Sequence, residues 1–95
     1  MELRYTEHLK LRMKFRDIPY AMPKEVYEEA EERYYDISTS YYIAIKKLNH
    51  AGKIRTMAVT YNKYGNKIEI ITIHPIKEGQ KEKRISSGRW MKLWI

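Results

Sequence analysis

Apolar residues are concentrated in the stretch Lys67–Pro75, around which we expect the rest of the chain to be organised. It holds four isoleucines and one threonine, whose branched side chains favour a pleated and packed surface. Isoleucines occupy both faces of the pattern, so we expect a central strand that is covered on both sides. Pro75 lacks an amide hydrogen and is expected to end the strand. Strict alternation places four side chains on one face, the last at the rim of the sheet: Ile68, Ile70, Thr72 and His74.

Two helices are expected before this strand, where the apolar period is close to 3.6 residues. Thr6 can cap a helix over about residues 7–16, and Pro23 suits the first turn of a second helix over about residues 23–33. The first helix aligns a basic stripe between two apolar pairs, and the stripe consists of His8, Arg12 and Arg16. Two interpretations stay open. Either the arginine stems cover the core and their heads pair with carboxylates, or the stripe lines a partly covered cleft.

From residue 34 onward the apolar period changes to two, which is typical of strands. The predicted strands are Tyr34–Ile37, Tyr41–Leu48 and Ile54–Tyr61, followed by Lys67–Pro75. Short turns between them favour an antiparallel meander of about four strands. The sequence therefore predicts one α+β domain over residues 1–95, with two N-terminal helices packed on an antiparallel β-meander.

The register of the last hairpin decides which residue lies beside His74. A loop centred between Tyr64 and Gly65 would place Arg55 opposite His74. A change of one residue in the centring would place Thr56 there instead, on the face opposite Arg55.

Composition narrows the classes of partner and site. The 95 residues include 19 basic and 12 acidic side chains, for a net charge of +7, which suggests a polyanionic partner. The chain has no cysteine, which excludes disulfides and thiolate metal sites. Three scattered histidines and no paired carboxylates at ligand spacing predict no metal site, and no cofactor motif is present. Without a long apolar run or an apolar leader, we expect a cytoplasmic protein that does not enter the membrane.

The last nineteen residues concentrate positive charge, with six basic and two acidic side chains. Trp90 in this tail either closes the core or, with Arg89 beside it, forms a pair that stacks on a base and binds a phosphate. Four tail residues are the candidates for RNA binding: Lys77, Lys81, Lys83 and Arg84.

Basic residues combined with a histidine match the chemistry of metal-free RNA cleavage. That reaction needs a base for the 2′-hydroxyl, an acid for the leaving 5′-oxygen, and cations around the charged phosphorane. His74, on a rigid strand end, is the candidate general acid or base, because histidine titrates near neutral pH.

Several short motifs also resemble a known family. The helix carrying His8, Arg12-Met13 and Arg16-Asp17-Ile18, the strand end Ile71–Pro75 and the tail Arg84–Trp90 are similar to small BrnT-like proteins of the RelE/ParE-like toxin superfamily. The resemblance implies a helical pair on an antiparallel sheet that acts on mRNA. RelE-like members use lysine, arginine and a late tyrosine or histidine, whereas ParE-like members bind gyrase and do not cut RNA. No tyrosine follows Tyr64 here, so His74 would take the tyrosine's place.

The resulting hypothesis is a toxin-like, metal-independent endoribonuclease of a toxin–antitoxin pair. His74 would be catalytic, with Arg55, Arg84 and Arg89 steadying the phosphates. The basic stripe of His8, Arg12 and Arg16 would orient or support the site. Its expected partners are RNA, free or on the ribosome, and an acidic antitoxin, and a homo-oligomer is left open. The alternative is a non-catalytic basic module that binds RNA or an acidic protein.

Overall fold

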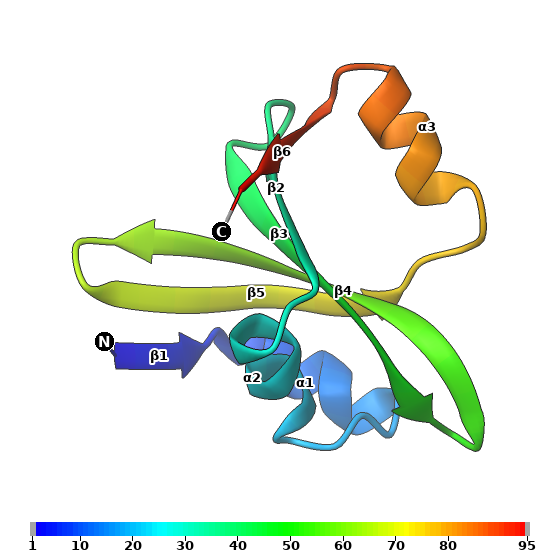
Figure 1. Cartoon of the computed structure of the whole chain (residues 1–95). Coiled ribbons are helices and arrows are strands. Elements are labelled where there is room, and N and C mark those ends of the chain that lie inside the picture. Colours follow the sequence, from blue (N-terminus) through cyan, green and yellow to red (C-terminus); the bar gives the residue numbers. More distant parts are fainter. Residues whose placement is uncertain (1, 95) are drawn as a thin grey trace.

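Six strands form one mixed sheet in the order β1-β5-β4-β3-β2-β6, as the computed structural model of residues 2–94 shows (Figure 1). The strands are β1 (Glu2–Tyr5), β2 (Glu32–Asp36), β3 (Tyr41–His50), β4 (Lys53–Tyr64), β5 (Lys67–Pro75) and β6 (Trp90–Leu93). Three short helices accompany them: α1 (Glu7–Phe15), α2 (Met22–Glu28) and α3 (Gln80–Ser86).

The expected architecture of two N-terminal helices on a four-stranded meander is wrong. Strands β2 to β5 do form a consecutive antiparallel series, but β1 adds a parallel strand beside β5 and β6 extends the other edge beside β2. The third helix, α3, lies in the tail. The additional strands have only four residues each, which is too short for a period of two to be distinguished from a helical one.

The helices begin where the sequence indicated. The Thr6 hydroxyl accepts a hydrogen bond from the Leu9 amide at 3.1 Å and so caps α1. A proline lies in the first turn of α2, as expected. The second helix stops at Glu28, however, and β2 starts at Glu32, where helix was expected to continue. Tyr34 and Asp36 are both buried on one face of β2, which is the alternation of a strand. The chain therefore changes from helix to strand before residue 33, where the helix was expected to end.

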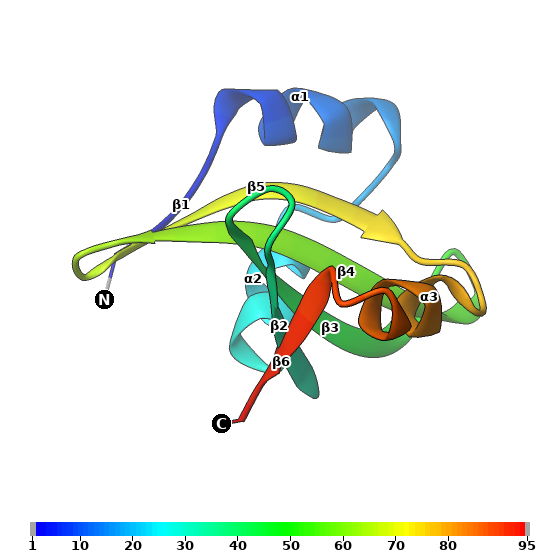
Figure 2. The ribbon, with the colours of Figure 1, turned by 90° about the horizontal axis from the view of Figure 1, so that it is seen from above.

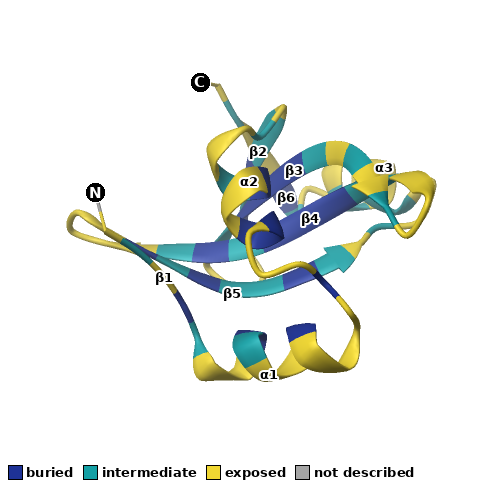
Figure 3. Ribbon diagram, turned by 90° about the horizontal axis from the view of Figure 1, so that it is seen from below, coloured by how far each residue is buried: buried dark blue, intermediate teal, exposed yellow. Residues whose placement is uncertain are grey.

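One face of the sheet is covered by α1 and α2. Figure 3 shows the buried positions of α1 on the side toward the strands and the exposed positions on its outer side. The helices contribute Leu9, Met13, Met22 and Val26 to this core, and the central strands contribute Met57, Val59, Tyr61, Ile68, Ile70 and Ile73. The opposite face carries a smaller cluster of Tyr34, Ile43, Ile45, Ala58 and Trp90. Within residues 2–94, no helix has the length and apolar character to cross a bilayer.

A β-bulge in β5 separates the side chains that simple alternation had grouped. Thr60 pairs with Thr72 while Tyr61 pairs with Ile70, so Ile71 is an extra residue without a partner. Ile70 and Ile73 therefore both join the core under the helices. His74 instead lies opposite Ala58, whose side chain belongs to the cluster on the other face. The prediction that His74 shares a face with Ile68 and Ile70 is wrong for this reason.

Candidate functional site

A cleft opens where β5 becomes an edge strand. The parallel partner β1 pairs with β5 only as far as Tyr5 and Ile70, and α1 lies alongside the remainder of the strand. The hollow between them has a volume of about 380 Å³, and we call it the His74 cleft. Its polar residues are Arg12, Arg16, Thr72 and His74, and its apolar residues are Leu9, Met13, Ile18 and Ile73. An apolar floor thus meets a basic rim.

The arginines of the basic stripe line this cleft. Arg12 and Arg16 are both exposed, and neither has a carboxylate oxygen within 4.0 Å among residues 2–94. The interpretation in which they pair with carboxylates over the core is therefore wrong, and the cleft interpretation fits. The third member of the stripe, His8, does not line the hollow. Its Nε2 lies 3.4 Å from Arg12 Nη1.

His74 is half-buried at the strand end, and neither ring nitrogen has a hydrogen-bond partner among residues 2–94. No polar side-chain atom in the described chain is both fully buried and unpaired, so these nitrogens remain reachable. Burial lowers the pKa of His74 below its usual 6.5, and the positive charges of Arg84, Arg16 and Arg12 lower it further. The imidazole is consequently mostly uncharged at neutral pH and able to accept a proton.

Arg84 approaches His74 from a second helix. Figure 2 shows α1 on one side of β5 and α3 beyond the end of β5 on the other side. The Arg84 guanidinium carbon lies 5.3 Å from the centre of the Trp90 ring, and no carboxylate pairs with it among residues 2–94. Three arginines without acidic partners therefore converge on one histidine. By contrast, Arg4, which lies outside the cleft, pairs with the carboxylate of Glu69.

Arg55 does not lie beside His74, and the predicted register is wrong. The turn joins Tyr64 to Lys67, one position later than expected, and the bulge adds a further residue to the offset. Ala58 consequently takes the place opposite His74. The Arg55 Nε donates to the His50 carbonyl oxygen at 3.3 Å instead.

A buried carboxylate binds Arg89, which was expected to steady a phosphate. Its Nε and Nη2 donate to the Asp36 carboxylate at 3.0 Å and 3.1 Å. Trp90 Nε1 lies 3.3 Å from the same carboxylate, and Trp90 is buried in the core rather than free to stack on a base. Asp36 is 2% exposed and was missed by the sequence analysis, where an isolated acidic residue beside a turn carried no signal.

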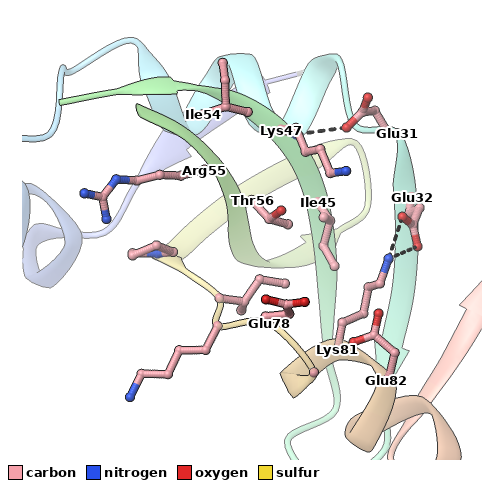
Figure 4. Close-up of a pocket in the computed structure, with 14 residues that line it drawn as sticks. Glu31, Glu32, Ile45, Lys47, Ile54, Arg55, Thr56, Glu78, Lys81 and Glu82 are labelled. Atoms are coloured by element: carbon pink, nitrogen blue, oxygen red, sulfur yellow. Dashed lines mark hydrogen bonds and ion pairs between the residues drawn. The ribbon is translucent and has the colours of Figure 1, made fainter. Parts of the chain in front are cut away.

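The other basic residues proposed for RNA binding differ in their surroundings. Lys81 pairs with Glu32 at 3.0 Å, whereas Lys77 and Lys83 are exposed. Beside them lies an open groove of about 710 Å³, shown in Figure 4. Four glutamates line this groove, namely Glu31, Glu32, Glu78 and Glu82, together with four basic residues, namely Lys47, Arg55, Lys77 and Lys81. Acidic and basic side chains are therefore mixed along this side of α3.

No family model, curated protein or solved structure matches this chain. In the described residues 2–94, no group of three or more His, Asp or Glu side chains is placed to hold a metal ion.

Proposed function

We propose that the His74 cleft binds single-stranded RNA and that His74 takes part in cleaving it. The observation that supports this proposal is the half-buried, unpartnered imidazole of His74 among three arginines that lack acidic partners. Arginines without carboxylates are suited to bind phosphate oxygens, for which their planar donors are well matched.

The chemistry follows from the charge states of these groups. Uncharged His74 removes the proton from a ribose 2′-hydroxyl, and the 2′-oxygen forms a bond to the adjacent phosphorus. The bond to the 5′-oxygen breaks, and that oxygen takes a proton from water. Arg12 and Arg16 line the same cleft and would stabilise the extra negative charge on the phosphorane. The products are a 2′,3′-cyclic phosphate and a 5′-hydroxyl.

The shape of the cleft favours an unpaired strand. The apolar floor of Leu9, Met13 and Ile18 can receive one exposed base while the arginines hold its phosphate. In a duplex the bases are stacked and cannot enter such a hollow, so single-stranded loops and ends are the expected targets.

The cellular setting belongs to the same proposal. The resemblance to BrnT-like toxins and the net charge of +7 support a cytoplasmic toxin that cuts mRNA, free or on the ribosome. An acidic antitoxin could inhibit it by pairing with Arg12, Arg16 and Arg84, which have no carboxylate partners in residues 2–94.

The decisive experiment compares wild type with His74→Ala on labelled single-stranded RNA, with and without ribosomes and in the presence of a chelator. We expect His74→Ala to lower the cleavage rate by about 100-fold or more, a typical contribution of a general acid or base, with RNA affinity retained. Lys67→Gln is the matched control, because Lys67 is exposed at the opposite end of β5. Equal cleavage by wild type and His74→Ala would remove His74 from the mechanism.

A second candidate function is RNA binding without cleavage. It is favoured by the fact that, within residues 2–94, the lining of the cleft holds no carboxylate and no second histidine beside His74, so no partner acid is in place. Binding by wild type with no cyclic phosphate product in either assay format would select this function.

A further inference from the structure

A second hollow continues from the His74 cleft. It has a volume of about 330 Å³ and shares Arg16 and Ile18 with that cleft. The remaining lining includes Arg55, Met57 and Pro75, and we call it the Arg55 hollow. Pro75 directly follows His74 in the chain, so the two hollows lie next to each other at the end of β5. Arg16, at the C-terminal cap of α1, lines both.

Arg55 is held in place and still has free donors. Its Nε donates to the His50 carbonyl oxygen, which fixes one edge of the guanidinium group. Its two Nη groups have no protein partner among residues 2–94. Figure 4 shows the guanidinium directed away from Glu31, Glu32 and Glu82, which lie across the groove. Arg55 therefore presents its unused donors on the side where Arg16 also lies.

We propose that the Arg55 hollow is a second phosphate subsite, which binds the phosphate next to the one at His74 in a single-stranded oligonucleotide. The proposal rests on the function proposed for the His74 cleft and extends it. Arg16 would contact both phosphates from its position in the wall common to the hollows. A planar guanidinium with free donors can bind a phosphate in a bidentate manner.

The groove of Figure 4 borders the Arg55 hollow, because Arg55 and Pro75 line both. A strand that continued past Arg55 would meet a mixture of glutamates and lysines rather than a surface of one charge. The proposal therefore covers two phosphates, one in each hollow.

The test uses 2′-O-methyl oligoribonucleotides with one, two, three or four phosphates, which cannot be cleaved at a 2′-hydroxyl. Dissociation constants are measured at several salt concentrations for wild type, Arg55→Gln and Lys67→Gln. In wild type the second phosphate should strengthen binding by roughly tenfold, as expected for a charge-assisted contact. Arg55→Gln should abolish this gain and lower the salt slope for the longer oligomers by about 0.7. Lys67→Gln removes the same charge at the far end of β5 and should keep the gain.

The outcomes separate the two proposals. A gain from the second phosphate that depends on Arg55, combined with no cleavage of ordinary RNA, would support the subsite and reject the catalytic function. The absence of a gain in wild type, or a gain that Arg55→Gln retains, would overturn the subsite whatever the cleavage assay shows. Arg55→Lys keeps the charge but loses the planar donors, and it should recover only part of the gain. Thermal unfolding confirms that each variant is folded.

Discussion

Replacing Asp36 by asparagine tests whether Arg89 belongs to the fold rather than to an RNA surface. Asp36 is 2% exposed, and its carboxylate accepts hydrogen bonds from the Ser38 amide, the Arg89 guanidinium and the Trp90 indole. Asp36→Asn keeps the shape of the side chain but removes the charge and one acceptor. Arg89 is then left without its counter-ion.

The expected loss of stability can be bounded from the exposure of the two partners. Removing one member of a fully buried ion pair costs about 3–5 kcal/mol. The Arg89 side chain is 37% exposed, so solvent compensates part of this cost and the estimate falls to about 2.5 kcal/mol. For a domain of this size, that loss corresponds to a decrease of about 10–20 °C in Tm.

The effect of Asp36→Asn should also depend on pH. Burial opposes ionisation of Asp36, but the hydrogen bonds from Arg89 and Ser38 and the charge of Arg89 hold its pKa below the usual 3.8. A carboxylate with a lowered pKa stabilises the fold at pH values above about 3.8 and loses this contribution as the pH falls further. The difference between wild type and Asp36→Asn should therefore be full at pH 7 and shrink below pH 4.

Urea unfolding followed by circular dichroism at pH 7 and pH 3.5 measures both effects. Arg89→Gln and the double variant complete a cycle in which the two single losses should not add, because they remove the same interaction. A loss below about 0.5 kcal/mol for Asp36→Asn at pH 7 would show an ordinary solvated pair, which refutes the reasoning and returns Arg89 to the candidates for RNA contact.

Two further predictions concern the arginines of the His74 cleft. Arg84→Gln should raise the pKa of His74, because the charge of Arg84 lowers this pKa more than the charges of Arg16 and Arg12 do. An NMR titration measures this change, and the acid limb of any cleavage profile should move to higher pH with it; an unchanged midpoint would show that Arg84 does not act on His74. Arg12→Ala should change the free energy of unfolding by less than about 0.5 kcal/mol, because Arg12 is exposed and has no carboxylate partner in residues 2–94, while RNA binding weakens. Urea unfolding and a binding titration check this pair of results, and a large loss of stability would contradict it.

The strongly patterned parts of the fold could be predicted from the sequence. Alternation of branched and aromatic residues located β3, β4 and β5, and the capping residue Thr6 located the start of α1. The short elements β1, β6 and α3 were missed, because four to seven residues hold too little of either period.

Residues of the candidate site could be placed from the sequence only where their positions depend on the geometry of a single helix or strand. The spacing of Arg12 and Arg16 along one helix was enough to offer a cleft as one of two interpretations, because positions four apart lie on the same side. Placing Arg55 required a register across a hairpin, which one shifted turn and one bulge displaced. Arg89 required knowledge of its partner Asp36, 53 positions away in the chain.

The bulge at Ile71 has a consequence for how such a surface can change over generations. No substitution at position 74 can carry that side chain to the opposite side of the sheet, because the backbone decides the direction. Loss of the single codon for Ile71 would not do so either, because Thr72 would then follow Ile70 directly and still pair with Thr60. The histidine would stay opposite Ala58, on the face that it occupies now. Only a shift of the register between β4 and β5 would move the imidazole to the other face of this strand.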